Sequence, residues 1–124
     1  MATVLYVEHN WDNVLLVKRL LEARGHELVW AADGSTGLRL SEACYPDLIL
    51  LDIELPDMDG HDVARHIRAD AGHRLFNVPV IAITSNTRRG AALNALAAGC
   101  DVYMPKPIDI HQLWELVGHY CPAN

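Results

Sequence analysis

The residues best suited to chemistry in this sequence each stand at the end of an apolar, β-rich segment. Asp52 ends the run DLILLD, and Thr84 ends VIAIT. Glu8 and His9 follow TVLYV, and Lys106 comes just after CDVYM. A carboxylate can attack phosphorus and form an aspartyl phosphate. Neighbouring acids can bind a divalent cation, while an amine and a hydroxyl can bind phosphoryl oxygens. These residue types indicate phosphoryl chemistry if the fold brings them together.

The segment that ends in Asp52 is apolar at every position from residue 48 to residue 51. Such a run predicts a strand covered on both faces, as in the middle of a parallel sheet. The Pro, Asp and Gly content of residues 53–60 predicts a loop after it. Asp52 would then lie at the carboxyl end of a rigid strand, where an open α/β sheet binds its ligands. From this stretch alone, an aspartate that only ends a strand or caps the next helix is an equally good interpretation.

The rest of the chain predicts the elements that must position these side chains. We expect strands at residues 3–7, 27–31, 47–52, 80–83 and 100–104, with the second at the sheet edge. Helices are expected from Asn10 or Asp12 to Gly25, at 35–43, 61–69 and 88–98, and after Asp109, with a connection at 71–77. Alternating strands and helices with right-handed crossovers predict a flavodoxin-like, doubly wound α/β fold. Its five parallel strands would have the order 2-1-3-4-5, with five helices.

Composition narrows the class of protein. The 124 residues are 51% hydrophobic and carry a net charge of −6, which fits one folded domain. No apolar run approaches the roughly 20 residues that cross a bilayer, and no signal peptide is visible. The three cysteines lack a CxxC spacing, so a reducing cytoplasm is expected. The acidic balance argues against direct binding to nucleic acid.

Four segments then match a known family in order and spacing: residues 4–8, 46–60, 79–84 and 98–107. Together they resemble the receiver domain of bacterial two-component response regulators. The resemblance covers essentially the whole chain and implies one receiver domain at residues 1–124, of the stand-alone type.

The resemblance implies a role for each matching residue. Asp52 corresponds to the phosphoacceptor, which takes a phosphoryl group from a histidine kinase or a phosphotransfer protein. Thr84 and Lys106 correspond to the hydroxyl and lysine that contact the phosphate. Tyr103 corresponds to the aromatic residue that turns inward when the hydroxyl moves. The bond between Lys106 and Pro107 is expected to be cis, as in the family.

The resemblance also implies an Mg²⁺ site, from which this sequence departs at one position. Glu8 and Asp52 correspond to metal-binding acids, and Glu54 to the residue whose main-chain carbonyl binds the metal. His9 stands where the family usually has a second acid that binds it directly. The missing charge is worth several kcal/mol at ~4 Å and an effective dielectric constant of ~20. We therefore expect weak Mg²⁺ binding and slow or absent phosphorylation by small phosphoryl donors. Two arrangements remain: a protonated His9 that replaces part of the cation's charge, or a His9 that turns outward.

The predicted function is a phosphorylation-dependent switch that acts through protein partners and is not an enzyme in the usual sense. In the family, the face formed here by residues 88–98, 100–104 and the last helix binds partners or a second receiver, so a homodimer is one option. The alternative is a degenerate receiver, a phosphate-independent interaction module, suggested by His9. A flavodoxin-like enzyme or cofactor binder is a remote third option, because no Gly-rich loop follows the first strand.

Overall fold

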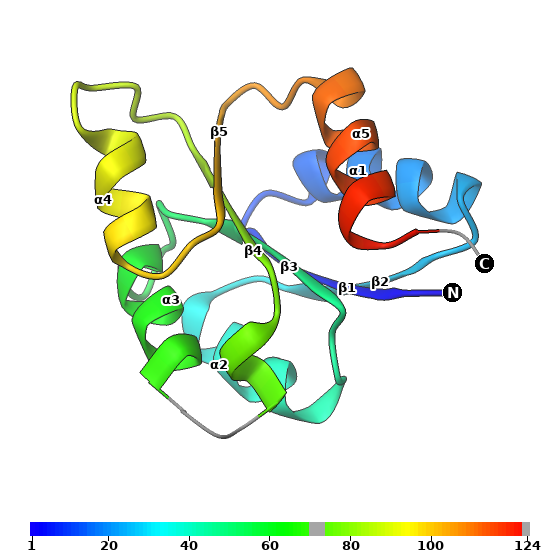
Figure 1. Ribbon diagram of the computed structural model, residues 1–124, viewed down its shortest axis with the longest axis horizontal. Coiled ribbons are helices and arrows are strands. Elements are labelled where there is room, and N and C mark those ends of the chain that lie inside the picture. Colours follow the sequence, from blue (N-terminus) through cyan, green and yellow to red (C-terminus); the bar gives the residue numbers. More distant parts are fainter. Residues whose placement is uncertain (70–73, 123–124) are drawn as a thin grey trace.

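A computed structural model describes residues 1–69 and 74–122 of the chain. A five-stranded parallel sheet forms its centre, with the strand order β2-β1-β3-β4-β5. Figure 1 shows α1 and α5 side by side on one face of the sheet and α2, α3 and α4 on the other. The fold class and the strand order predicted from the sequence are confirmed.

The strands are short and lie close to their predicted positions. Their bounds are β1 (Thr3–Val7), β2 (Glu27–Ala31), β3 (Leu48–Asp52), β4 (Val80–Thr84) and β5 (Val102–Pro105). Every residue of β3 and β4 is buried, because helices cover both faces of these inner strands. Most residues of β2 are partly or fully exposed, as expected for the edge of the sheet. In the parallel register, Val7 pairs with Leu51 and Asp52 with Ile83, so the carboxyl ends lie along one edge.

Polar side chains cap the starts of three helices. Their bounds are α1 (Trp11–Ala23), α2 (Gly34–Ala43), α3 (Gly60–Ala69), α4 (Ala91–Ala97) and α5 (Ile110–Tyr120), with a short 3₁₀ helix at Arg74–Asn77. Asn10, Asp33 and Asp109 accept hydrogen bonds from main-chain N–H groups in the first turns of α1, α2 and α5. Within the described residues, no helix is both long and apolar enough to cross a membrane.

Two hydrophobic cores hold the layers together, one on each face of the sheet. The side chains of β1 alternate between them: Val4 and Tyr6 face α1 and α5, whereas Leu5 and Val7 face the other three helices. This alternation also determines the face of the sheet towards which the side chains of Glu8 and Asp52 point. Each lies two residues beyond a side chain on the α1–α5 face, Tyr6 and Leu50 respectively.

Two predicted starts are wrong by two residues or more. The fourth helix begins at Ala91 rather than at residue 88, because Gly90 adopts a left-handed conformation with a φ of 90°. The fifth strand begins at Val102 rather than at residue 100, since the N–H of Cys100 still bonds to Ala95 and closes the end of α4. The connection predicted for residues 71–77 contains the 3₁₀ helix, and its residues 71–73 lie outside the described part of the chain.

Candidate functional site

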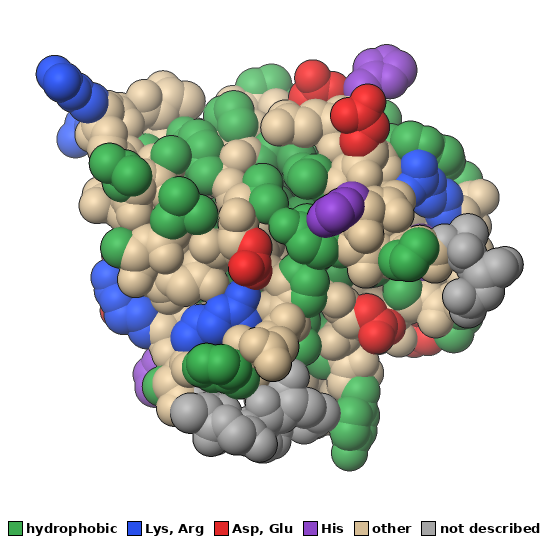
Figure 2. All heavy atoms as spheres, viewed as in Figure 1, with side chains coloured by type: hydrophobic (Ala, Val, Ile, Leu, Met, Phe, Trp, Pro, Cys, Tyr) green, Lys and Arg blue, Asp and Glu red, His purple; other side chains and the backbone are tan. Residues whose placement is uncertain are grey.

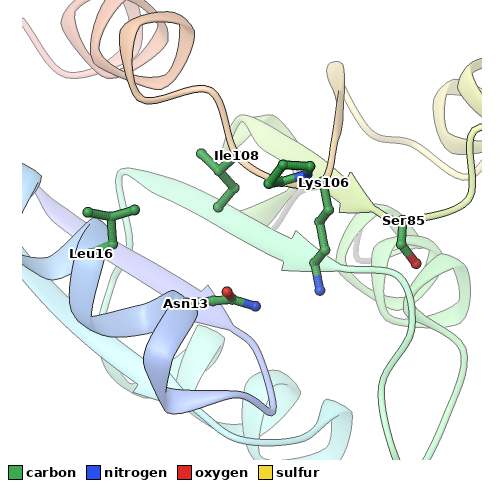
Figure 3. A pocket seen from close by; sticks show the side chains of 6 residues that line it. Asn13, Leu16, Ser85, Lys106 and Ile108 are labelled. Carbon is green, nitrogen blue, oxygen red and sulfur yellow. The ribbon is translucent and has the colours of Figure 1, made fainter.

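The carboxyl edge of the sheet brings Asp52, Glu8 and Lys106 into direct contact. Nζ of Lys106 lies 2.8 Å from Oδ2 of Asp52 and 3.4 and 3.5 Å from the two carboxylate oxygens of Glu8. Only 3% of Asp52 and 1% of Glu8 are exposed. Figure 3 shows Lys106 reaching from the turn after β5 towards the ends of the central strands. The peptide bond between Lys106 and Pro107 is cis, as expected.

Burial and charge shift the pKa of Asp52 and of Lys106. Burial and a hydrogen bond with the neighbouring Glu8 carboxyl raise the pKa of Asp52 to about 7, although Lys106 opposes the shift. Burial would lower the pKa of Lys106, but the ion pairs with Asp52 and Glu8 outweigh it and raise that pKa above its ordinary value. The two acids therefore hold more negative charge than one ammonium group can balance. Added positive charge, such as a divalent cation, would favour the ionised form of Asp52.

Asn13, in the first turn of α1, is a site residue that the sequence did not reveal. Its side-chain amide donates a hydrogen bond to Oε1 of Glu8. It also lines a pocket of about 410 Å³ between α1 and the turn after β5, together with Leu16, Ser85, Lys106, Pro107 and Ile108. In Figure 3 the ends of Asn13 and Lys106 face one another across the mouth of the site. Asn13 thus fixes the orientation of the Glu8 carboxylate beside the lysine.

Glu54 has a larger structural role than the sequence predicted. Its main-chain N–H donates to Oδ1 of Asp52 at 2.9 Å, which orients that carboxylate. Its side chain accepts hydrogen bonds from the Thr84 hydroxyl and from the main-chain N–H and hydroxyl of Ser85, the latter two at 2.8 Å. Partial burial would raise the pKa of Glu54, but these hydrogen bonds, together with Lys106, lower it below its ordinary value. The loop after β3 is therefore tied to the end of β4 by a charged side chain.

A chain of hydrogen bonds leads from Thr84 to Tyr103. The main-chain N–H of Asn86 donates to Oγ1 of Thr84 at 2.9 Å. The hydroxyl of Tyr103, on β5, donates to the carbonyl oxygen of the same Asn86 at 2.9 Å. Tyr103 is half-buried, whereas only 3% of Thr84 is exposed. A change in the hydrogen bonds of Thr84 would therefore reach the surface of β5 through one residue of the loop after β4.

His9 does not belong to the buried group. The residue is exposed, whereas Glu8 before it is buried. Within the described residues, no group of three or more His, Cys, Asp or Glu side chains could hold a metal ion. The carboxylate oxygens at the site are those of Glu8 and Asp52, both within reach of Lys106. Hard oxygens of this kind suit Mg²⁺ better than a metal that prefers imidazole or thiolate.

The fold and the site define the class of protein: a doubly wound α/β domain with an acidic, lysine-paired site at the carboxyl edge of its sheet. Residues 4–118 match the response regulator receiver domain. The chain therefore belongs to the family of response regulator receiver domains and is a receiver domain of two-component signalling. The resemblance inferred from the sequence motifs is confirmed.

Individual relatives agree with this assignment. The chain is 35% identical over 118 residues to the polar-differentiation response regulator DivK of Brucella abortus, and the match covers 95% of this chain and 94% of that protein. It is 33% identical to the receiver domain of the sensor histidine kinase PA1611 of Pseudomonas aeruginosa, with 96% of each chain covered and a TM-score of 0.84. That structure holds a magnesium ion in its active site cleft. A two-component response regulator of Clostridium difficile, 27% identical, superimposes with a TM-score of 0.88 over 97% of this chain and 95% of that chain.

Proposed function

We propose that this receiver domain is a phosphorylation-dependent switch that accepts a phosphoryl group on Asp52 from a histidine kinase or a phosphotransfer protein. The observation that supports it most directly is the contact between the buried Asp52 carboxylate and Lys106. A buried carboxylate is costly unless it is paired, and this one lies at the carboxyl edge of the sheet, where ligands bind. Its place in the fold favours a functional carboxylate over one that only ends a strand.

The proposed reaction moves one phosphoryl group from nitrogen to oxygen. A carboxylate oxygen of Asp52 attacks the phosphorus of a phosphohistidine, the new O–P bond forms as the P–N bond breaks, and the imidazole nitrogen keeps the electron pair. Lys106 holds the carboxylate in place and then binds the phosphoryl oxygens together with Thr84. The protein remains a switch rather than an enzyme, since the phosphoryl group stays on it until hydrolysis.

The carboxylate oxygens at the site suit Mg²⁺ as ligands. Glu8, Asp52 and the main-chain carbonyl of Glu54 would hold it, with water as the remaining ligands. When bound, Mg²⁺ supplies positive charge that offsets the charge of the phosphoryl oxygens. The exposed His9 contributes no oxygen, so the affinity is expected to be low.

The face formed by α4, β5 and α5 is the proposed surface for a downstream partner or a second copy of the domain. Figure 2 shows hydrophobic side chains gathered in this region. Leu93 and Leu96 of α4 are 72% and 48% exposed, which is high for leucine. Tyr103 lies on β5 and is linked to Thr84 through Asn86. Phosphorylation would shift an existing equilibrium of this face by changing that link.

The test is intact-mass analysis after incubation with Mg²⁺ and acetyl phosphate or a phosphorylated histidine donor. We expect the wild-type protein to gain one phosphoryl group and Asp52→Asn to gain none. A folded wild-type protein that gains no phosphoryl group from either donor would contradict the switch. That result would instead favour the second candidate, a phosphate-independent interaction module, for which the replacement of an acid by the exposed His9 is the specific observation.

A further inference from the structure

The Glu54 carboxylate accepts hydrogen bonds from groups at the end of β4, including the Thr84 hydroxyl that the proposed phosphoryl group would need. Its two oxygens accept hydrogen bonds from the Thr84 hydroxyl and from two groups of Ser85. Its own main-chain N–H bonds to Asp52, so the carboxylate is attached directly beside the proposed nucleophile. The negatively charged Glu54 carboxylate thus accepts the hydrogen bonds that Thr84 and Ser85 donate at the carboxyl end of β4.

A phosphoryl group on Asp52 would present acceptor oxygens and negative charge to the same place. The Thr84 hydroxyl has one proton to donate, and it cannot serve the Glu54 carboxylate and a phosphoryl oxygen together. Two anions that share these donors would also repel each other, because each keeps its charge at neutral pH. The hydrogen bond between Glu54 and the Thr84 hydroxyl must therefore break before that hydroxyl can bind a phosphoryl group on Asp52.

We propose that Glu54 is an internal competitor of the phosphoryl group and sets how readily the domain is phosphorylated. This inference rests on the proposed function of Asp52 and adds a regulatory side chain to it. Glu54 acts as a positioning residue: in the unphosphorylated protein it holds Thr84 and Ser85, and it must release Thr84 before that hydroxyl binds a phosphoryl oxygen.

The surroundings of Glu54 give the released side chain a place to go. The residue is exposed, so its carboxylate can turn into solvent. It lines a shallow hollow with Ser85, Asn86, Thr87 and Arg88. Arg88 is also exposed and lines the same hollow. Release would also remove the hydrogen bonds that tie Thr84 and Ser85 to Glu54, and Asn86 links Thr84 to Tyr103. The competitor therefore couples the site to the face that contains β5.

The decisive experiment compares Glu54→Ala and Glu54→Gln with the wild-type protein. We expect Glu54→Ala to accept the phosphoryl group of acetyl phosphate about tenfold faster, the effect of removing one charge-assisted hydrogen bond that competes with the reaction. Glu54→Gln loses the charge but keeps an acceptor oxygen, so its rate should lie between the two. Glu115→Gln, which removes the same charge from α5, is the matched control and should react like the wild type.

Two further measurements separate competition from a structural role. Loss of the hydrogen bonds should lower the urea midpoint of Glu54→Ala slightly while its phosphorylation becomes faster, whereas a purely structural residue would impair both. In the absence of any phosphoryl donor, the Ser85 amide should exchange with solvent faster in Glu54→Ala than in the wild type. An unchanged exchange rate would contradict the hydrogen bond on which the inference depends.

The outcomes distinguish this inference from the proposed function. Faster phosphorylation of Glu54→Ala beside a reactive wild-type protein supports the competitor. Equal or slower phosphorylation of Glu54→Ala beside a reactive wild-type protein overturns the competitor and leaves the switch intact. If neither protein is phosphorylated, the proposed function fails, and the competitor fails with it.

Discussion

The balance of charge around Lys106 is the main residue-scale feature of this receiver domain. Two buried carboxylates face one ammonium group, and the exposed His9 stands where the resemblance to the family implies a third acid. Lys106 already neutralises part of the charge that a divalent cation would otherwise meet. A carboxylate at position 9 would restore a hard oxygen ligand and one negative charge, so His9 is expected to limit the affinity for Mg²⁺.

Replacing His9 with aspartate tests this directly. We expect His9→Asp to bind Mg²⁺ at least about tenfold more tightly than the wild-type protein, because one more charge lies close to the divalent ion. Tryptophan fluorescence can report the titration, since Trp30 donates a hydrogen bond to the carbonyl of Glu8 and packs at a tilted angle against Trp11.

The control for this titration is His66→Asp, which adds the same charge to the last turn of α3, away from the site. It should leave Mg²⁺ affinity unchanged. A sub-millimolar dissociation constant for the wild-type protein would contradict the expected weakness of the site.

At the scale of elements, the close approach of α3 to the end of β3 shapes the loop around Asp52. Gly60, the first residue of α3, donates its main-chain N–H to the carbonyl of Ile53 at 2.9 Å. A Cβ at Gly60 would lie 2.5 Å from the carbonyl oxygen of Asp52 and from Cα of Ile53. Both are backbone atoms that cannot turn aside, so only glycine lets the helix begin this close to the proposed nucleophile.

Gly60→Ala should therefore disturb both stability and the site. We expect a loss of about 2 kcal/mol or more in the free energy of unfolding, as for other overpacked positions, together with slower phosphorylation of Asp52. Urea denaturation and intact-mass analysis measure the two effects.

Gly25→Ala provides the comparison for this substitution. Gly25 has a φ of +78°, and apart from the glycine and its chain neighbours no heavy atom lies within 4 Å of the position that a Cβ would take there. Its replacement should cost only the left-handed strain of about 1 kcal/mol. Phosphorylation of Gly25→Ala should match the wild type, and an equal effect of both substitutions on phosphorylation would contradict a specific role of Gly60.

At the scale of the whole molecule, burying the ionised Asp52 at the site lowers the free energy of unfolding. The pKa of Asp52 rises from 3.8 to about 7 on folding, mainly because the carboxyl is buried and also because Glu8 lies beside it. Between these values the folded protein binds more protons than the unfolded chain. The free energy of unfolding must then fall as the pH rises through this range. A binding site often keeps such a cost because the same charges serve the ligand.

Asp52→Asn should remove this cost in metal-free buffer. We expect the variant to be more stable than the wild type by about 1–3 kcal/mol at a pH above the folded-state pKa, with the difference shrinking as the pH falls. Thermal or urea unfolding across this range with a chelator measures it. Glu115→Gln on the surface of α5 should show no such pH dependence. A stability difference that grows on acidification would contradict the raised pKa.

Much of this protein follows from the order of its residues alone. The uninterrupted apolar run before Asp52 predicted a buried central strand, and all of β3 is buried. Strict alternation of strand and helix patterns predicted the parallel sheet and its order, because right-handed crossovers allow few alternatives. That topology was enough to predict that the ends of β1, β3, β4 and β5 meet at one edge, and Glu8, Asp52 and Lys106 do so.

Other features depend on the tertiary structure. Glu54 and Thr84 are 30 residues apart, and their hydrogen bond depends on the conformations of two side chains that periodicity does not describe. The contact between Asn13 and Glu8 likewise requires the position of α1 over β1. The start of α4 was missed because Gly90 adopts its left-handed conformation inside a helix-forming sequence. Hydrophobic patterns encode which face of an element is buried, whereas the partner of each polar side chain is decided only when the elements have packed.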